Sequence, residues 1–184
     1  QHMQVTPIEA PILKWKNHTH TQEIWMDVIL SVDTFECLED NETPFSLIKK
    51  LQDILKCVRS LQPTFCSTGF EVQTNLDFDR SWGLGSSSTF INNIAQWAQV
   101  NPYELLDKTF GGSGYDVAVA EARQAILFTR NEYTPLVEPL SYDPSFKDQL
   151  YFVHLNEKQN SQQEVAAYHT VSYTHLRAHE TKPN

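Results

Sequence analysis

Apolar residues recur at steps of three and four along residues 44–61, and this period predicts an amphipathic helix. The apolar positions share one face of that helix: Leu47, Ile48, Leu51, Ile54, Leu55, Val58 and Leu61. Thr43 and Pro44 supply residue types that favour a helix N-cap and a first helical position. We expect the helix to end before Pro63.

Alternating apolar and polar residues predict strands on both sides of this helix. Residues 69–78 alternate strictly, as a half-buried strand does. Residues 23–36 alternate more loosely and predict a strand, or a strand with a bulge. Residues 12–15 form a shorter candidate strand, and the polar loop 17–22 makes a hairpin the expected connection.

Segments with the helical period and segments with the strand period also alternate along the rest of the chain. It predicts helices at 90–98, 102–110, 115–122 and 161–168, and strands at 125–128 and 151–155. Asn101 is the expected N-cap of the second of these helices, which stops at Gly111 and Gly112. Because strands and helices interleave with at least one hairpin, we expect an α+β fold in a layered sheet-and-helix arrangement.

Composition narrows the class of protein. The 184 residues are 40% hydrophobic and 20% charged, which is typical of one soluble globular domain. No apolar run approaches the roughly 20 residues that cross a bilayer, so no membrane partner is expected. The 14 Lys and Arg against 23 Asp and Glu give a net charge of -9 without a basic stripe, which argues against a nucleic-acid partner.

Cysteine and histidine positions add no metal site. Cys37, Cys57 and Cys66 lack CxxC spacing, which argues against a disulfide framework or a metal knuckle and favours a reduced, cytoplasmic setting. His18 and His20 lie in a polar loop without partnering Cys or His, so we do not assign them a metal.

The first candidate for chemistry is the turn 83–88 (GLGSSS), between a predicted strand and a predicted helix. Glycines let the backbone approach a ligand closely, and the N–H groups of a helix N-terminus attract anions. The turn is not a Walker A loop, because no Gly-Lys-Ser/Thr follows, and it lacks the GxSxG pattern of serine hydrolases. The alternative is a structural turn in which Ser86 or Ser87 only caps the helix.

The second candidate is the turn 110–116 (FGGSGYD), which also leads into a predicted helix. Its glycines leave room for a substrate beside Asp116, whose carboxylate has the chemistry to accept a proton from a hydroxyl. The alternative is that Asp116 is a helix cap.

Together the two turns resemble the GHMP small-molecule kinases, which include galactokinase, homoserine kinase, mevalonate kinase and phosphomevalonate kinase. In that superfamily a GLGSS motif after a strand forms the nucleotide phosphate loop, and a later SGxD turn carries an active-site aspartate; these match residues 83–87 and 113–116. The closer resemblance is to a bacterial branch with a Gly-Tyr-Asp-Ile-Ala signature, which stands here as 114–118 (GYDVA). Residues 82–88, 92–97, 108–112 and 155–161 also resemble that branch, and the resemblance covers residues 10–168.

The resemblance implies an ATP- and Mg²⁺-dependent kinase that phosphorylates a small metabolite, with mevalonate or phosphomevalonate favoured. It assigns the ATP phosphates to Gly83, Leu84, Gly85, Ser86, Ser87 and Ser88. Ser87 is the implied Mg²⁺ ligand, Asp116 orients or deprotonates the attacking hydroxyl, and the acceptor lies against Gly112, Ser113 and Gly114. Trp82 and Trp97 are expected to pack against the sheet rather than stack on adenine.

The chain also departs from the superfamily. Asp79 replaces a proline four residues before the first glycine, and this change is expected to loosen the turn. The early strand-borne lysine and a later glycine-rich motif are missing, and Lys14 does not match the lysine motif. We therefore expect a fragment: an N-terminal lobe at 1–122, related in fold to a ribosomal protein domain, and the start of a C-terminal lobe at 123–170. Residues 171–184 have neither a helical nor a strand period, so we expect a non-native tail there, with a native disordered tail as the alternative. The alternative function is a noncatalytic nucleotide-binding or interaction domain on the same fold.

Overall fold

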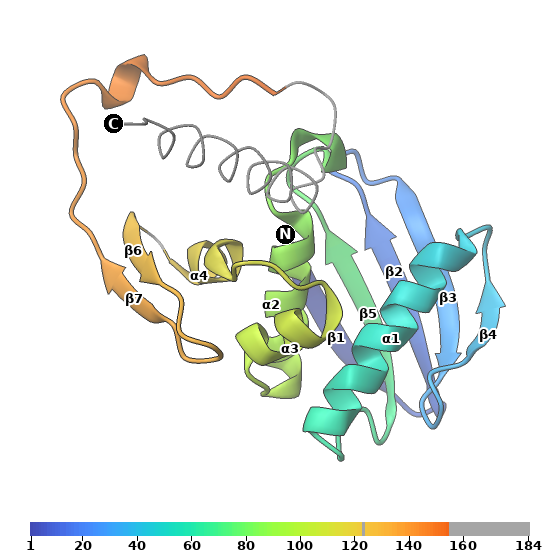
Figure 1. Cartoon of the computed structure of the whole chain (residues 1–184). Helices are drawn as coiled ribbons and strands as arrows, with labels where there is room; N and C mark the ends of the chain where they lie inside the picture. The colour runs from blue at the N-terminus through green and yellow to red at the C-terminus, as the bar shows by residue number, and fades with distance from the viewer. Residues whose placement is uncertain (123, 155–184) are drawn as a thin grey trace, which may run out of the picture.

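The computed structural model describes residues 1–122 and 124–154 and shows a mixed α+β fold (Figure 1). Its main sheet is five-stranded, with the order β1-β5-β2-β3-β4. The strands are β1 (His2–Ile8), β2 (Ile12–His18), β3 (Ile24–Ser31), β4 (Cys37–Asp40) and β5 (Gly69–Asn75). β2 and β5 run parallel, and the other neighbouring pairs are antiparallel. The α+β class is confirmed.

Four helices within the described residues accompany this sheet. They are α1 (Phe45–Leu61), α2 (Ser86–Ala98), α3 (Pro102–Thr109) and α4 (Tyr115–Glu121). A short 3₁₀ turn, η1 (Arg80–Trp82), precedes α2. Beyond α4, β6 (Ile126–Thr129) and β7 (Leu136–Pro139) form an antiparallel hairpin, and η2 (Lys147–Gln149) is a second 3₁₀ turn. None of these helices is long and apolar enough to span a membrane.

The core lies between the sheet and the helices. Leu13 and Trp15 of β2 are fully buried, while Lys14 between them occupies the opposite face, because successive strand residues alternate. α1 and α2 cover one face of the sheet (Figure 1). Trp15 belongs to the buried cluster that both helices share, and its ring packs edge-on against Phe90 of α2, with the ring centroids 5.8 Å apart. α1 buries the predicted face, including Leu51 and Leu55.

The first hairpin and α1 confirm the sequence pattern. β2 and β3 pair in antiparallel register from Ile12↔Ser31 to His18↔Ile24, with an irregularity at Asn17 and His18. The cap of α1 differs from the expectation, because Pro44 is the N-cap. The Thr43 hydroxyl instead accepts a hydrogen bond from the Asp27 N–H (3.0 Å) and donates to the Asp27 carbonyl (3.3 Å), so it fastens the loop to β3.

Several elements differ from the pattern-based expectation. β1, β4 and β7 were not predicted, and β1 pairs along its whole length with β5. The expected strand at 23–36 ends at Ser31, because a turn follows in which the Phe35 N–H donates to the Ser31 carbonyl (2.9 Å). Residues 151–154 form no strand, and their side chains are exposed. The expected helix at 161–168 and the tail 171–184 lie outside the described residues.

Candidate functional site

Asp79 shapes the approach to the first glycine-rich turn. Its Oδ1 accepts hydrogen bonds from the Ser81 N–H (2.8 Å) and the Ser81 hydroxyl (2.7 Å), which makes it the N-cap of η1. These bonds favour the ionised carboxylate and lower the pKa of Asp79. Asp79, which stands where the GHMP kinases have a proline and was expected to loosen the turn, therefore accepts two local hydrogen bonds that order it.

Both glycines of the first turn have left-handed backbone conformations, with φ of 71° at Gly83 and 70° at Gly85. Gly85 is the N-cap of α2 and provides no side-chain cap. The first helical hydrogen bond runs from the Thr89 N–H to the Gly85 carbonyl (3.0 Å). The N–H groups of the three preceding residues, Ser86, Ser87 and Ser88, therefore lie in the uncapped first turn, where helices bind anions.

This geometry corrects two expectations about the first turn. The helix begins at Ser86 rather than near residue 90, so the three serines belong to the helix. Neither Ser86 nor Ser87 is the cap, because Gly85 holds that position. The serine side chains are half-buried, and their hydroxyls add donors beside the backbone N–H groups.

The second turn is also built from glycines in positive-φ conformations, at Gly111, Gly112 and Gly114. The Ser113 hydroxyl accepts a hydrogen bond from the Tyr115 N–H (3.2 Å). Gly114 is the N-cap of α4, so Asp116 occupies the first turn of this helix and is not its cap. Asp116 is exposed, and no hydrogen bond or ion pair joins its carboxylate to another described residue.

The two turns meet in the folded chain. A Cβ placed on Gly85 would lie 3.7 Å from both Cβ and Cγ of Asp116 and 3.8 Å from its Oδ2. The Asp116 carboxylate therefore lies against the backbone at the start of α2. Packing of α4 on α2 brings these residues together, and Val117 of α4 is fully buried in the shared core.

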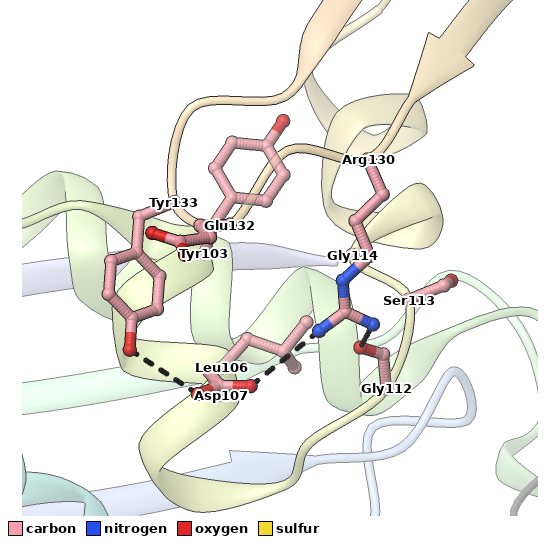
Figure 2. A pocket seen from close by; sticks show the side chains of 9 residues that line it. All are labelled: Tyr103, Leu106, Asp107, Gly112, Ser113, Gly114, Arg130, Glu132 and Tyr133. Atoms are coloured by element: carbon pink, nitrogen blue, oxygen red, sulfur yellow. Dashed lines mark hydrogen bonds and ion pairs between the residues drawn. The ribbon is translucent and has the colours of Figure 1, made fainter.

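A cavity of about 300 Å³ opens beside the second turn (Figure 2). Gly112, Ser113 and Gly114 line it, together with residues of α3 and of the loop between β6 and β7. Arg130 donates to the Gly112 carbonyl (2.8 Å), and its guanidinium lies 3.7 Å from the Asp107 carboxylate (Figure 2). The hairpin thus holds the turn by a charged side chain.

Two tyrosines complete this cavity. The Tyr133 hydroxyl donates to Asp107 Oδ2 (3.4 Å), and the Tyr133 carbonyl accepts from the side-chain amide of Asn101 (2.8 Å). Burial, with a smaller contribution from the Glu121 carboxylate, raises the pKa of Tyr103, so its hydroxyl is protonated at neutral pH. Sequence reasoning missed Tyr103, Asp107, Arg130 and Tyr133, because no motif connects these residues and only tertiary packing brings them to the turn.

The tryptophans differ in their roles. Trp97 packs in the core as expected, with its ring centroid 4.6 Å from that of Phe65 and 5.4 Å from that of Phe70. Trp82 was expected to pack against the sheet, but it does not belong to the core cluster. Its ring stacks on the imidazole of His154, with centroids 4.5 Å apart and an interplanar angle of 16°.

Oxygen atoms are the available metal ligands at the meeting point of the turns. No group of three or more His, Cys, Asp or Glu side chains within residues 1–122 and 124–154 is arranged to hold a metal ion, and His18 and His20 are included in that result. The Ser87 hydroxyl and the Asp116 carboxylate are hard oxygen donors. This donor set suits Mg²⁺ when a phosphate supplies further oxygens.

Comparisons with known proteins found no relative of the chain. No family model matches the chain, and neither the curated proteins nor the solved structures contain a match.

Proposed function

We propose that the chain carries the phosphate loop and the catalytic carboxylate of an ATP-dependent kinase of the GHMP type, which transfers the γ-phosphoryl group to a small metabolite. The observation that carries the proposal is the proximity of the Asp116 carboxylate to Gly85, where an added Cβ would lie 3.8 Å from Asp116 Oδ2. Two motifs that are separate in sequence supply, at one place, an anion-binding helix N-terminus and an exposed carboxylate. Phosphoryl transfer requires chiefly this combination of positioning and charge neutralisation.

Each residue then has a defined role. The N–H groups and hydroxyls of Ser86, Ser87 and Ser88 bind phosphate oxygens, and Ser87 also ligates Mg²⁺. Asp116 accepts the proton of the acceptor hydroxyl as that oxygen bonds to phosphorus. Bound ATP would supply the transferred phosphoryl group, with ADP as the leaving group.

The acceptor in this proposal is mevalonate or phosphomevalonate, and the choice comes from the family resemblance. Gly112, Ser113 and Gly114 bind it at the second turn; the same three residues line the cavity of about 300 Å³, whose lining does not include Asp116. That volume lies at the lower end of the range of about 300–1,000 Å³ typical of small-molecule pockets. It suits a small metabolite better than a macromolecular substrate.

Substitution of Asp116 by Asn tests the catalytic role. In the intact protein, D116N should lower ADP release with mevalonate or phosphomevalonate by about a hundredfold or more, because it removes the proton acceptor. ATP affinity, measured by calorimetry, should change little. E9Q is the control, since Glu9 is an exposed carboxylate between β1 and β2 and lines neither the turns nor the cavity. Unchanged turnover in D116N would exclude Asp116 as the proton acceptor.

One observation favours the noncatalytic alternative: among the described residues, no ion pair joins the Asp116 carboxylate to a Lys or Arg side chain. Under this alternative, the intact protein without any substitution binds ATP but releases no ADP with either acceptor. A G85A variant tests whether the first turn binds ATP at all, which both proposals require. A Cβ at φ 70° strains the turn, so G85A should weaken ATP binding under either proposal.

A further inference from the structure

A second cavity, of about 170 Å³, lies between α1, the sheet and the first turn of α2. Its walls are largely apolar and include Leu47, Leu51 and Phe90. Its polar lining consists of Gln1, Asn17, Trp25, Lys50, Arg80, Ser86 and Ser87. The cavity thus combines an apolar body with a cluster of polar groups, as small-molecule sites do.

Two buried hydrogen-bond donors at this cavity lack an oxygen partner in the described part of the chain. The Trp25 Nε1–H is buried and makes no hydrogen bond. Asn17 is only 1% exposed, and its Oδ1 accepts bonds from Trp15 Nε1 (2.8 Å) and the Thr74 hydroxyl (2.6 Å). Its Nδ2 donates to Met26 Sδ (3.2 Å), and a thioether is a weak acceptor. A buried donor with no acceptor, as at Trp25, or with only a weak one, as at Asn17, is unfavourable and marks a place where a stronger acceptor is expected.

Two cationic side chains line the same cavity. The Lys50 ammonium lies 4.0 Å from the centroid of the Phe110 ring, and the Arg80 guanidinium lies 3.8 Å from that of Trp25. No Asp or Glu side chain lines the cavity among the described residues, although the whole chain carries a net charge of -9. The first turn of α2 adds the positive end of a helix dipole. The charged side chains that line the cavity are therefore cationic and favour an anion, although the Asp79 carboxylate lies near Arg80.

We propose that this cavity binds a small organic anion, with its apolar body against α1 and its oxygens toward Trp25, Asn17 and Lys50. The proposal goes beyond the kinase activity, with which it shares only the lining residues Ser86 and Ser87. The volume of about 170 Å³ is below that of pockets for drug-sized ligands, so the ligand has few heavy atoms. Binding requires both the charge and the apolar body of the ligand, because the cavity offers hydrogen-bond donors on one side and aliphatic and aromatic carbons on the other.

The indole N–H signal of Trp25 is a direct probe of binding. It can be assigned in a ¹H–¹⁵N spectrum by its loss in W25F, and isovalerate is a suitable branched anion. We expect isovalerate to shift this signal in a saturable way, because its carboxylate accepts the unpaired N–H. Isovaleramide, which is neutral, and inorganic phosphate, which has no apolar body, should each bind at least about tenfold more weakly. Equal shifts with all three compounds, or none with isovalerate, would overturn the proposal.

Two variants and a control test the residues by calorimetry. W25F and K50Q should each weaken isovalerate binding about tenfold, because each removes a donor to the anion. K49Q is the matched control, since Lys49 is the next residue of α1 and its ammonium pairs with Asp53 on the exposed face. Equal losses in K49Q and K50Q would overturn the assignment, and K50Q retains the test if W25F does not fold. Saturable displacement of the Trp25 signal by ATP and not by isovalerate would assign the cavity to the nucleotide instead, without contradicting the proposed kinase.

Discussion

Cys66 shows how burial changes the chemistry of a single residue. The side chain is 5% exposed, and burial raises the pKa of its thiol from 9.0 to about 12, against the opposing effect of the Arg59 charge. At pH 8 we expect Cys66 to remain unreactive toward a thiol reagent in the native protein and to react after unfolding, because the thiolate is the nucleophile. Mass spectrometry of the labelled peptides measures this. Labelling of native Cys66 at the rate of the exposed thiol of a model peptide would contradict the burial argument.

The same shift makes stability depend on pH. The folded-state pKa is raised, so the protonated thiol contributes stability that is fully present below about pH 9 and is lost as pH rises toward about 12. The free energy of unfolding of the parent, relative to C66A, should therefore fall by at most about 1.4 kcal/mol per pH unit above pH 9. Urea unfolding of both proteins between pH 8 and 10.5 checks the sign. A parent protein that becomes more stable relative to C66A as pH rises would refute the prediction.

Gly69 is required for a different reason from the glycines of the turns. A Cβ on Gly69 would lie 1.8 Å from the Ala10 carbonyl oxygen, so the backbone would have to move. We expect G69A to lower the free energy of unfolding by about 3 kcal/mol, as overpacking does. At Gly83 nothing lies within 4 Å and only φ of 71° is unfavourable, so G83A should cost about 1 kcal/mol. Equal losses in urea unfolding would show that the Ala10 contact is not limiting.

At the scale of elements, Asn101 joins a helix cap to the wall of a cavity. Its Oδ1 accepts from the N–H groups of Tyr103 (2.9 Å) and Glu104 (3.2 Å), and its Nδ2 donates to the Tyr133 carbonyl (2.8 Å). N101A should destabilise the protein by about 1–2 kcal/mol, because it removes the cap and the tether. N101D keeps the acceptor and should recover most of that loss, since a carboxylate also suits a helix N-terminus. Urea unfolding compares the three proteins, and an N101D as unstable as N101A would assign the effect to the tether.

Elements with a strong local period were predicted, and those that depend on a distant partner were not. The buried face of α1 is visible in the sequence because every third or fourth residue is apolar, and β5 is visible because every second residue is apolar. In β1 only Met3 and Val5 pack against the core, and Pro7 interrupts the pattern. This strand is stabilised by its pairing with β5, more than 60 residues away, which no local period can indicate.

The candidate site divides in the same way at the scale of the whole molecule. The glycines at 83, 85, 112 and 114 could be chosen from the sequence, because positive φ strongly favours this residue type. The sequence placed Asp116 after the second turn, but its contact with Gly85 depends on how α4 packs on α2. Arg130 reaches the site only because the hairpin of β6 and β7 folds back to Gly112.

Arg59 connects parts of the molecule that share no secondary structure. It lies in the last turn of α1, and its guanidinium stacks on the Phe35 ring at 3.9 Å. It donates to four carbonyl oxygens, in the turn after β3 and in the segment before β5: those of Val32, Asp33, Phe65 and Cys66. One side chain therefore fixes the end of α1 against two loops at this edge of the core.

Replacing Arg59 by Met keeps the length of the side chain and removes every donor. R59M should lower the free energy of unfolding by about 3 kcal/mol, because several carbonyls lose a charged hydrogen-bond partner at once. R59K should recover only a minor part, since an ammonium cannot donate in the fixed planar fork of a guanidinium. K56M is the matched control on the exposed face of the same helix and should change the free energy by less than about 0.5 kcal/mol. Urea unfolding measures all three, and an R59K as stable as the parent would mean that charge alone, rather than the geometry of the four bonds, holds the loops to α1.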